Sequence, residues 1–508
     1  MTVSVFDFIP VAEHAAIIAR TSTYDATSDL GAAIADVKSR GETLYFPGGT
    51  YLVSTVTFDG ADYAIDTSAG VTFQQLQNLA GDIPIISIGG ASRLTIGDLN
   101  LVGNIATDVG ENRHGVLLAR CKDVTIGRIF ATDVRGDALY CYARNTSVAE
   151  RQSGCFVESV SGTNVYRNLL TVAGGEIRVG AVIHAGPVGY RDFDVEPNDA
   201  SGTYEAVDLQ IGYARVGSAE ITSDDRATIN HAVRIGILDA DFDRVQATTP
   251  PYPKAPGGGA YALGISRVDS VRIGQFRARN YNWWVVNLSV DWGSLDIGTF
   301  DVAHCALVDT PYNSMIVQRG NAQGGSVRIG TLICDAAKTR FLARVQDAGL
   351  LKIEVSNIRL MKCMAGNQLT GRFANGIIDL DGGNGTVLID STDVIFDNIE
   401  TVNAGSATGF YQCANIAAIN STLTFGTLDG GGSGTSDFVA INSSINGSAR
   451  DGVNLVLGGA VRVANIKVLG EQQPAIATPS SGMPIDSEAR AAISSMLTAL
   501  RNHGIIAA

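Results

Sequence analysis

Leu94-Thr-Ile-Gly-Asp-Leu99 and Val124-Thr-Ile-Gly-Arg-Ile129 are two copies of one phrase: apolar, any residue, apolar, Gly, any residue, apolar. Most steps between successive copies are one or two multiples of a unit of about 24 to 32 residues. Self-similarity at such a period is typical of a solenoid, in which each repeat adds one coil. Further copies centre on Val179, Ile211, Ile235, Ile273, Ile297 and Ile329, and degraded copies on Phe425 and Leu457.

The repeat unit has the periodicity of strands. Its apolar residues alternate with other residues, and its Gly is expected to supply a turn. Helical periodicity is absent inside the unit, which argues against ankyrin, TPR and HEAT repeats. We therefore predict an all-β fold, a right-handed single-stranded parallel β-helix.

Composition narrows the classes of partner. The chain has 508 residues and a formal net charge of −14. Nucleic acids and anionic membranes require basic patches, so neither is expected as a partner. An acidic surface suits a neutral or hydrated ligand such as a polysaccharide. No apolar run approaches 18 residues and the first residues lack a cationic segment, so neither a transmembrane span nor a signal peptide is expected.

The seven Cys are scattered and form no C-x-x-C pair. We expect them to be small core residues, not a disulfide framework or a zinc site. No cofactor is expected.

The N-terminal and central segments have different roles. Residues 1–55 are a lead-in with a helix expected to begin at Ser28-Asp29 and to end at Gly41. This helix would cover the open end of the solenoid. Residues 56–470 form the β-helix itself, with an extended Pro/Gly loop at residues 246–259.

The C-terminal segments point to assembly. Residues 471–485 are a linker with three Pro, and residues 486–508 contain a last helix over Asp486–Asn502 with one apolar side. One such helix is marginal alone, whereas three packed together would be stable. We therefore expect an oligomerisation segment and a homotrimer.

Two stretches resemble the pectate-lyase superfamily of β-helices, and most closely its phage tailspikes. The first comprises residues 5–55, including Tyr45-Phe-Pro-Gly-Gly-Thr-Tyr51 after the expected helix. The second comprises Arg167-Asn-Leu-Leu-Thr-Val172 and Asp192-Phe-Asp-Val-Glu-Pro-Asn198, and it departs from the superfamily at Leu169 and Asp192, where Gly is usual. The resemblance implies the β-helix fold, trimeric assembly and polysaccharide as the ligand class, without settling catalysis.

The β-phrases of three successive coils place a polar patch on one face. When Leu139–Tyr142, Leu170–Ala173 and Phe193–Glu196 are aligned, alternate residues point outward together. The residues of this patch are Tyr140, Tyr142, Thr171, Asp194 and Glu196, with Arg167 and Asn168 preceding the middle strand and Asn198 following the last.

Asp194 and Glu196 are the candidate catalytic pair. Two residues apart on a strand, their Cβ atoms are expected about 6.5–7 Å apart. That spacing falls in the window of about 6.5–9.5 Å of an inverting glycoside hydrolase. Glu220 is a third candidate, one coil further on. The alternatives are ligand binding without turnover, and a structural role in which the carboxylates bind backbone N–H groups and Asn198 shapes a turn. A lyase is less favoured, because the patch is itself acidic.

Acidic residues also recur further along the chain. Asp239, Asp241 and Asp243 resemble a metal site at first. Alignment of the coils favours instead a column of alternating charges, which neutralise one another at strand spacing. Its members are Arg215, Asp239, Arg277 and Asp301, with Asp241 and Arg279 two residues further on. No metal is therefore predicted.

Trp283, Trp284 and Trp292 lie close together in the sequence. Adjacent strand residues point to opposite faces, so one of the first two should be exposed. An exposed Trp284 could stack on a sugar ring, and burial at a subunit interface is the equal alternative. His114 and His184 have no matched Ser or Cys, so a triad is poorly supported.

These features favour a spike at the surface of a phage-like particle that binds and depolymerises a host surface polysaccharide. The alternatives are a non-catalytic adhesin or structural fibre of such a particle, and a free bacterial enzyme. The missing signal peptide counts against a secreted form of the last. The short lead-in implies that a virion-borne chain docks through a separate adaptor protein.

Overall fold

A computed structural model describes most of the chain, in two compact units, Met1–Val355 and Ser356–Ala508. Within the described part, no helix is both long and apolar enough to cross a membrane. The described residues are 1–77, 79–107, 112–142, 152–196, 207–222, 231–246, 261–281, 284–289, 291–305, 314–319, 325–346, 349–380, 387–403, 408–429, 436–449, 453–458, 461–463, 466–469 and 493–498.

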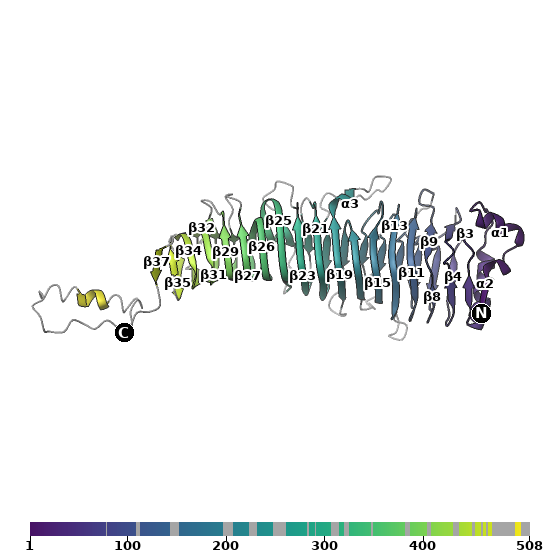
Figure 1. Cartoon of the computed structure of the whole chain (residues 1–508), viewed down its shortest axis with the longest axis horizontal. Coiled ribbons are helices and arrows are strands. Elements are labelled where there is room, and N and C mark those ends of the chain that lie inside the picture. Colours follow the sequence, from purple (N-terminus) through teal and green to yellow (C-terminus); the bar gives the residue numbers. More distant parts are fainter. Residues whose placement is uncertain are drawn as a thin grey trace, which may run out of the picture. The chain divides into compact units, whose positions relative to one another are not determined.

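The N-terminal elements of the first unit are β1 (Thr2–Ser4), η1 (Val5–Asp7), α1 (Val11–Ile18) and α2 (Thr27–Arg40) (Figure 1). The predicted helix is α2, and it ends as expected at Gly41, whose φ of 65° is left-handed. It begins earlier than expected, at Thr27, so that Ser28 and Asp29 lie in its first turn. The N-cap residue is Ala26, whose side chain forms no capping hydrogen bond.

The ladder of coils already begins inside the predicted lead-in, because Thr2 of β1 pairs with Thr43 of β2. The following strands are β2 (Thr43–Tyr45), β3 (Gly49–Val53), β4 (Val56–Phe58), β5 (Ala64–Asp66), β6 (Val71–Gln75), β7 (Ile86–Gly89), β8 (Thr95–Ile96), β9 (Leu99–Val102) and β10 (Val116–Ala119).

The later coils of this unit alternate a long strand with a short one. The long strands are β11 (Thr125–Thr132), β13 (Cys155–Thr163), β15 (Gly175–His184), β17 (Val207–Val216), β19 (Ala232–Asp241), β21 (Ser270–Arg279), β23 (Ser294–Ala303) and β25 (Ser326–Val345). The short strands are β12 (Leu139–Tyr142), β14 (Leu170–Val172), β16 (Phe193–Val195), β18 (Ala219–Thr222), β20 (Leu263–Ser266), β22 (Val286–Leu288) and β24 (Ser314–Gln318), and the helix α3 (Phe242–Gln246) follows β19.

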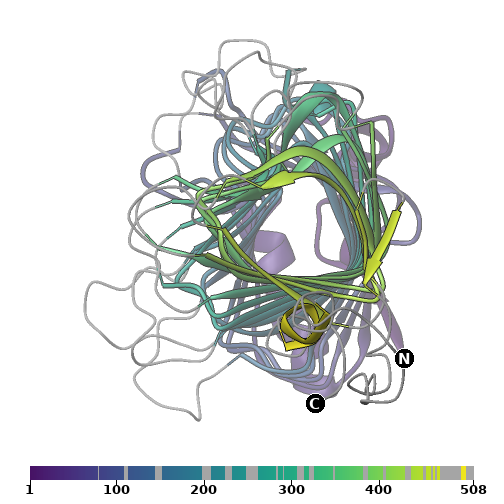
Figure 2. The same cartoon turned by 90° about the vertical axis from the view of Figure 1, so that its left-hand side faces the viewer.

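Each strand pairs in parallel with its equivalent one coil later. Ile235, for example, lies between Ile211 and Ile273, so the repeated phrase is the coil register itself. Seen end-on, the strands wind around an interior (Figure 2). The fold is therefore a right-handed parallel β-helix, as predicted.

In the later copies of the phrase the Gly has a different role from the one expected. Gly212, Gly236 and Gly274 have no positive φ and lie inside a continuous long strand, at the position that the pairing between coils skips. A Cβ on Gly236 would come within 2.5 Å of the Gly212 carbonyl oxygen of the preceding coil, and one on Gly274 within 2.6 Å of that of Gly236. Gly is required there for the close approach of successive coils and not for a left-handed turn.

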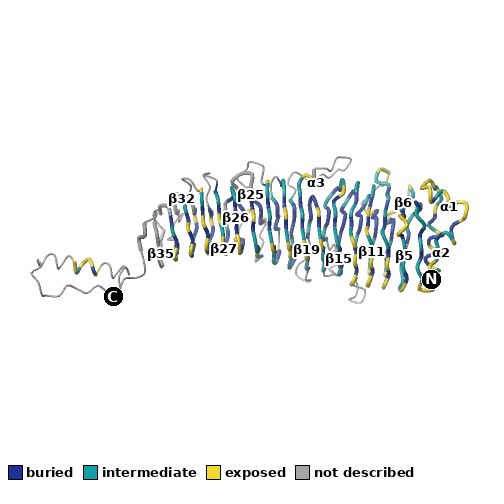
Figure 3. The backbone as a smooth tube through the Cα atoms, viewed as in Figure 1, coloured by how far each residue is buried: buried dark blue, intermediate teal, exposed yellow. Residues whose placement is uncertain are grey.

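Burial alternates along the strands, as the sequence pattern predicts (Figure 3). In β16 the side chains of Phe193 and Val195 point inward and are fully or almost fully buried, whereas Asp194 between them is only partly buried. Apolar side chains also stack between coils, with the Phe276 and Phe300 ring centroids 5.0 Å apart. All seven Cys are free and buried, which confirms their expected place in the core.

The second unit continues the pattern of parallel coils and ends in the antiparallel pair β36–β37. Its strands are β26 (Leu351–Asn367, beginning in the first unit), β27 (Leu369–Asp379), β28 (Leu388–Ile389), β29 (Thr392–Val402), β30 (Thr408–Tyr411), β31 (Ala414–Ile419), β32 (Thr422–Asp429), β33 (Ser436–Ile441), β34 (Ser444–Ala449), β35 (Val453–Gly458), β36 (Val461–Val463) and β37 (Ile466–Leu469). Of the predicted last helix, residues 493–498 are described and helical. The linker 471–485 and nearly all of the loop 246–259 lie outside the described residues.

Candidate active site

The short strands of the first unit align the candidate residues in one row. Tyr140 lies opposite Thr171, Thr171 opposite Asp194, and Asp194 opposite Glu220. This is the register expected from the sequence, including the place of Glu220 one coil beyond Asp194. We call these four positions, with Gly264 opposite Glu220, the carboxylate row.

Asp194 is the central group of the row. Its Oδ1 atom is buried and has no hydrogen-bond partner among the described residues. Burial raises the pKa of the Asp194 carboxyl well above its usual range, and the nearby carboxylates of Glu196, Glu220 and Asp137 raise it further. Asp194 is therefore suited to hold a proton where an ordinary Asp would have lost it, as a general acid must.

Glu196 lies beside Asp194 and has a cationic partner. Its Oε2 is 3.4 Å from Arg167 Nη2, and Arg167 Nε is 3.8 Å from Asp137 Oδ1. Asp137 is completely buried, and its Oδ1 accepts a hydrogen bond of 2.9 Å from the Asn168 backbone N–H. Sequence reasoning missed Asp137, whose buried carboxylate adds a second negative charge close to Arg167.

An aromatic group forms the end of the row nearest the N-terminus. The His114 and Tyr140 rings stack with centroids 4.5 Å apart, and those of Tyr140 and Tyr142 are 5.9 Å apart. His114 Nδ1 accepts a hydrogen bond from the Asp137 backbone N–H. Burial raises the pKa of Tyr140 to about 12, so its phenol stays protonated at neutral pH.

Glu220 is held by two residues that sequence reasoning missed, Arg191 and Tyr261. Arg191 Nε lies 3.2 Å from Glu220 Oε2, and Tyr261 Oη donates a hydrogen bond of 2.9 Å to Glu220 Oε1. Arg191 is three residues before Asp194, so its proximity could have been suspected. Tyr261 follows residues 247–260, which lie outside the described part of the chain and contain no copy of the repeated phrase, so the sequence gives no indication of its position.

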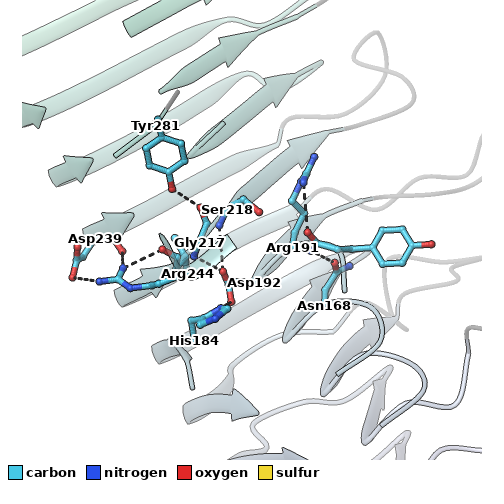
Figure 4. Close-up of polar contacts among 11 residues, drawn as sticks. Asn168, His184, Arg191, Asp192, Gly217, Ser218, Asp239, Arg244 and Tyr281 are labelled. Atoms are coloured by element: carbon cyan, nitrogen blue, oxygen red, sulfur yellow. Dashed lines mark hydrogen bonds and ion pairs between the residues drawn. The ribbon is translucent and has the colours of Figure 1, made fainter. Parts of the chain in front are cut away.

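A buried carboxylate fixes the corner that leads to Glu220 (Figure 4). Asp192 Oδ2 accepts hydrogen bonds of 2.5 and 3.2 Å from the backbone N–H groups of Gly217 and Ser218, and Asp192 Oδ1 is 2.7 Å from His184 Nδ1. The Tyr281 hydroxyl donates to the Gly217 carbonyl from a later coil. The departure from Gly at position 192 thus supplies an acceptor for the next corner.

Two predicted contact residues are not exposed. Thr171 and Asn168 are buried, and Asn168 Nδ2 donates a hydrogen bond of 2.9 Å to Thr171 Oγ1. Asn168 Oδ1 in turn accepts a hydrogen bond of 3.0 Å from the Arg191 backbone N–H (Figure 4). We correct their expected role accordingly: they support the surface between Tyr140 and Asp194 and do not form it.

The other predicted contacts lie apart from the row or outside the described residues. Trp284 is partly buried, with the Arg319 guanidinium carbon 4.9 Å from its ring centroid. It lies just before β22, three coils beyond Asp194, so the structure does not bring it to the carboxylates. Trp292 is buried. Asn198 and Trp283 lie outside the described residues.

The charge column has the predicted register, with Asp239 between Arg215 and Arg277 and Arg277 opposite Asp301. Its closest ion pairs have other partners, which sequence spacing did not predict. Asp239 Oδ2 is 3.3 Å from Arg244 Nη2 in α3, and Asp301 Oδ2 is 2.7 Å from Arg279 Nη2. Over the described ranges, no group of three or more His, Cys, Asp or Glu is arranged to hold a metal ion.

The registers and these contacts define a parallel β-helix protein with a carboxylate-rich surface site. No protein-family model and no curated protein sequence matches the chain. Among solved structures it is similar to the crystal structure of a hyperthermoactive exopolygalacturonase from Thermotoga maritima, at 11% sequence identity over 91% of each chain, with a TM-score of 0.24. This likeness is too low to support an argument, so the function has to be inferred from the site.

Proposed function

We propose that this chain binds an extended polysaccharide and hydrolyses its glycosidic bonds. The observation that carries the proposal is Asp194, a carboxyl with a raised pKa and a buried oxygen that has no hydrogen-bond partner among the described residues, next to a second carboxylate that has its own Arg. Two carboxyl groups whose environments differ in this way match the division of labour in glycoside hydrolysis, in which one is the acid and the other the base.

In the proposed reaction Asp194 gives its proton to the glycosidic oxygen as the bond from that oxygen to the anomeric carbon breaks. Glu196 removes a proton from a water molecule, whose oxygen forms the new bond to the anomeric carbon. Glu196 directly follows β16, two residues after Asp194, and the proposed inverting reaction requires the two carboxyl groups to lie about 6.5–9.5 Å apart with that water between them. The Arg167 guanidinium beside Glu196 balances the negative charge of the base.

An elimination mechanism is less well supported by the site. A lyase requires a base that removes a carbon-bound proton and a cation that neutralises the acidic sugar. The pKa of Tyr140 is raised to about 12, which makes its phenol a poor base at neutral pH. The nearby guanidiniums of Arg167 and Arg191 already face carboxylates.

The finer proposal is that the chain is a homotrimeric spike of a phage-like particle, attached through an adaptor protein, with a host surface polysaccharide as substrate. It is supported by the resemblance of residues 5–55 to phage tailspikes and by the apolar side of the last helix. Mass photometry at micromolar concentration is expected to give three times the chain mass of 53.2 kDa. A monomer would contradict the trimer.

A second candidate function is a non-catalytic adhesin. The paired charges at Glu196 and Glu220 favour it, because carboxylates held by Arg can accept hydrogen bonds from sugar hydroxyls without any chemistry. This candidate shares the ligand class of the first and differs in whether the bound glycan is cut.

The test is a panel of purified capsular and O-antigen polysaccharides, screened for binding, for new reducing ends and for absorbance at 235 nm. We expect reducing ends without 235-nm absorbance. Asp194→Asn and Glu196→Gln should each lower turnover at least ~10²-fold while binding persists. Asp208→Asn, which changes an exposed carboxylate paired with Arg234, is the matched control and should leave turnover unchanged.

Other outcomes of this test point elsewhere. Binding without reducing ends supports the adhesin, and absorbance at 235 nm supports a lyase. Full cleavage by both variants would show that Asp194 and Glu196 are not the catalytic pair. The pH–rate curve should be bell-shaped, with its two apparent pKa values belonging to the coupled carboxylates jointly.

A further inference from the structure

The carboxylate row ends in an unusual way, because its fifth position is a Gly covered by the ring of a residue three positions earlier in the sequence. Gly264 lies opposite Glu220 in β20. A Cβ built on Gly264 would come within 2.5 Å of Tyr261 Cε2, 3.0 Å of Cζ and 3.1 Å of Oη. The phenol of Tyr261 therefore occupies the space that a side chain at position 264 would take.

The phenol has a defined place beside Glu220. Its Oη donates to Glu220 Oε1 at 2.9 Å, and the Arg191 guanidinium carbon is 5.0 Å from the ring centroid. Burial and the nearby Glu220 carboxylate raise the pKa of Tyr261, so the phenol remains a donor. Tyr261, Arg191 and Glu220 are all partly accessible, with 18% of the Arg191 side chain and 32% of the Glu220 side chain exposed.

The row is covered beyond this point. Asn287 follows Gly264 in register and Val317 follows Asn287, and these residues are 8% and 1% exposed. On the other side of Asp194, in contrast, Tyr140 is partly accessible. The cluster of Arg191, Glu220 and Tyr261 is therefore followed by two covered coils in the C-terminal direction.

We propose that Arg191, Glu220 and Tyr261 form a sugar-binding subsite next to Asp194, which takes one neutral sugar unit at the end of the row. This inference rests on the proposed function, and it makes Glu220 a binding group and not a third catalytic carboxylate. Gly264 is the residue that makes the subsite possible, because any side chain there would displace the phenol.

The chemistry of the cluster fits sugar hydroxyl groups. A carboxylate offers about four lone-pair sites and a guanidinium five N–H donors. Glu220 Oε1 accepts one hydrogen bond from Tyr261 and Oε2 accepts one from Arg191, which leaves acceptor sites available for a ligand. Because the Arg191 and Glu220 charges balance, the cluster has no excess positive charge for a uronic acid, and a neutral sugar unit is the better ligand.

The test compares three variants with the parent on the polysaccharide panel, by binding affinity and, where cleavage occurs, by KM and kcat. Gly264→Ala forces the phenol away without removing any functional group of the site. Tyr261→Phe keeps the ring and removes only the hydroxyl. The matched control is Gly89→Ala, since Gly89 lies on the same series of short strands in β7 and an added Cβ there meets nothing within 4 Å.

We expect Gly264→Ala to weaken binding at least ~10-fold and Tyr261→Phe at least ~3-fold, with KM rising accordingly and kcat changing less than ~3-fold. Gly89→Ala should behave as the parent. Tyr261→Phe introduces no new atoms, so it keeps the test valid if Gly264→Ala does not fold. Neutral polysaccharides should give the largest losses.

The possible outcomes separate this inference from the proposed function. If the parent binds or cleaves and neither variant differs from it, the subsite is wrong and the hydrolase proposal stands. Loss of binding in the variants of a parent that never cleaves supports the subsite and contradicts the hydrolase. A parent that binds no polysaccharide of the panel overturns both. A fall in kcat with KM unchanged would return Glu220 and Tyr261 to the catalytic machinery.

Discussion

Two series of charged residues run across the coils of the first unit, and they are built on opposite principles. In the charge column on the long strands, Asp239 has an Arg opposite it on each side. In the carboxylate row on the short strands, Asp194 has Glu220 directly opposite and Glu196 two residues away. Opposite charges at this spacing stabilise a sheet, whereas like charges destabilise it. The column serves the fold, and the row is tolerated for another reason.

The difference also lies in where the neutralising charges are. The column contains its own countercharges, and Arg244 and Arg279 add ion pairs to it. The five positions of the row contain none: Arg191, just before β16, pairs with Glu220, and Arg167, just before β14, pairs with Glu196 beside the row. Asp194 is left without one at close range, and its pKa rises. Asp194 destabilises the sheet by its charge, and its surroundings shift its pKa. Functional sites are expected to contain residues of this kind.

The largest effect on stability is expected where the row is anchored to the fold. Asp192→Ala removes the acceptor of the Gly217 and Ser218 N–H groups and leaves them buried. The loss should be about 2–4 kcal/mol of unfolding free energy, because each unpaired buried donor costs on the order of 1–3 kcal/mol. Urea unfolding measures it, with Asp192→Asn, which keeps one acceptor oxygen, as the milder control. An Asp192→Ala variant as stable as the parent would show that the corner does not need this carboxylate.

A smaller and pH-dependent effect is expected at Asp194. The pKa of this carboxyl in the fold is raised above the unfolded value of about 3.9, so the folded state holds the proton more tightly. Its stabilising contribution is full below pH ~4 and is lost as the pH rises through the raised pKa. Asp194→Asn should therefore increase the melting temperature relative to the parent more at pH 8 than at pH 4.

The control for that measurement is Asp208→Asn, an exposed carboxylate that forms an ion pair with Arg234. It should give no such gain at pH 8. If Asp194→Asn lowers the melting temperature at both pH values, the carboxylate stabilises the fold in its charged form, and the contrast between row and column fails.

The smallest effect is expected in the column. Asp239→Ala removes a carboxylate that is 25% exposed and places Arg215, Arg277 and Arg244 near an empty position. Surface ion pairs contribute little, so the change should be about 1 kcal/mol or less by chemical denaturation. EDTA should leave the parent melting temperature unchanged. A fall on EDTA treatment would show that a metal ion and not alternating charge stabilises this face.

The fold and the register of the row could be predicted because both follow from local alternation. One apolar phrase per coil fixes which side chains point inward, and aligned phrases then place Asp194 opposite Glu220. The same logic gave the column, with Arg215 opposite Asp239. In a solenoid each coil contacts its neighbours only, so sequence spacing translates directly into position.

What the sequence did not reveal depends on side chains that reach across corners and loops. Tyr261 is brought to Glu220 by a segment whose path no periodicity describes, and Asp192 acts on backbone N–H groups that carry no sequence signal. Thr171 was predicted to be an exposed contact because alternation shows to which side of the strand a side chain points but not how deeply it is buried. In the structure the Asn168 side chain lies against Thr171. The predicted role of the Gly in the later copies was wrong for a related reason. The close approach between coils cannot be seen in a single copy of the phrase.

The stacked glycines of the long strands have a consequence for how such a chain can change over time. Each of Gly212, Gly236 and Gly274 lies against the carbonyl of the one before it, so an added methyl group in one coil would push its neighbour out of line. Point substitutions at these glycines are therefore unfavourable, whereas insertion or removal of a whole coil leaves the same kind of contact between the coils that remain. Evolution can lengthen or shorten the molecule by complete coils at a distance from Asp194, and the four coils from Tyr140 to Glu220 are the stretch that has to be inherited together.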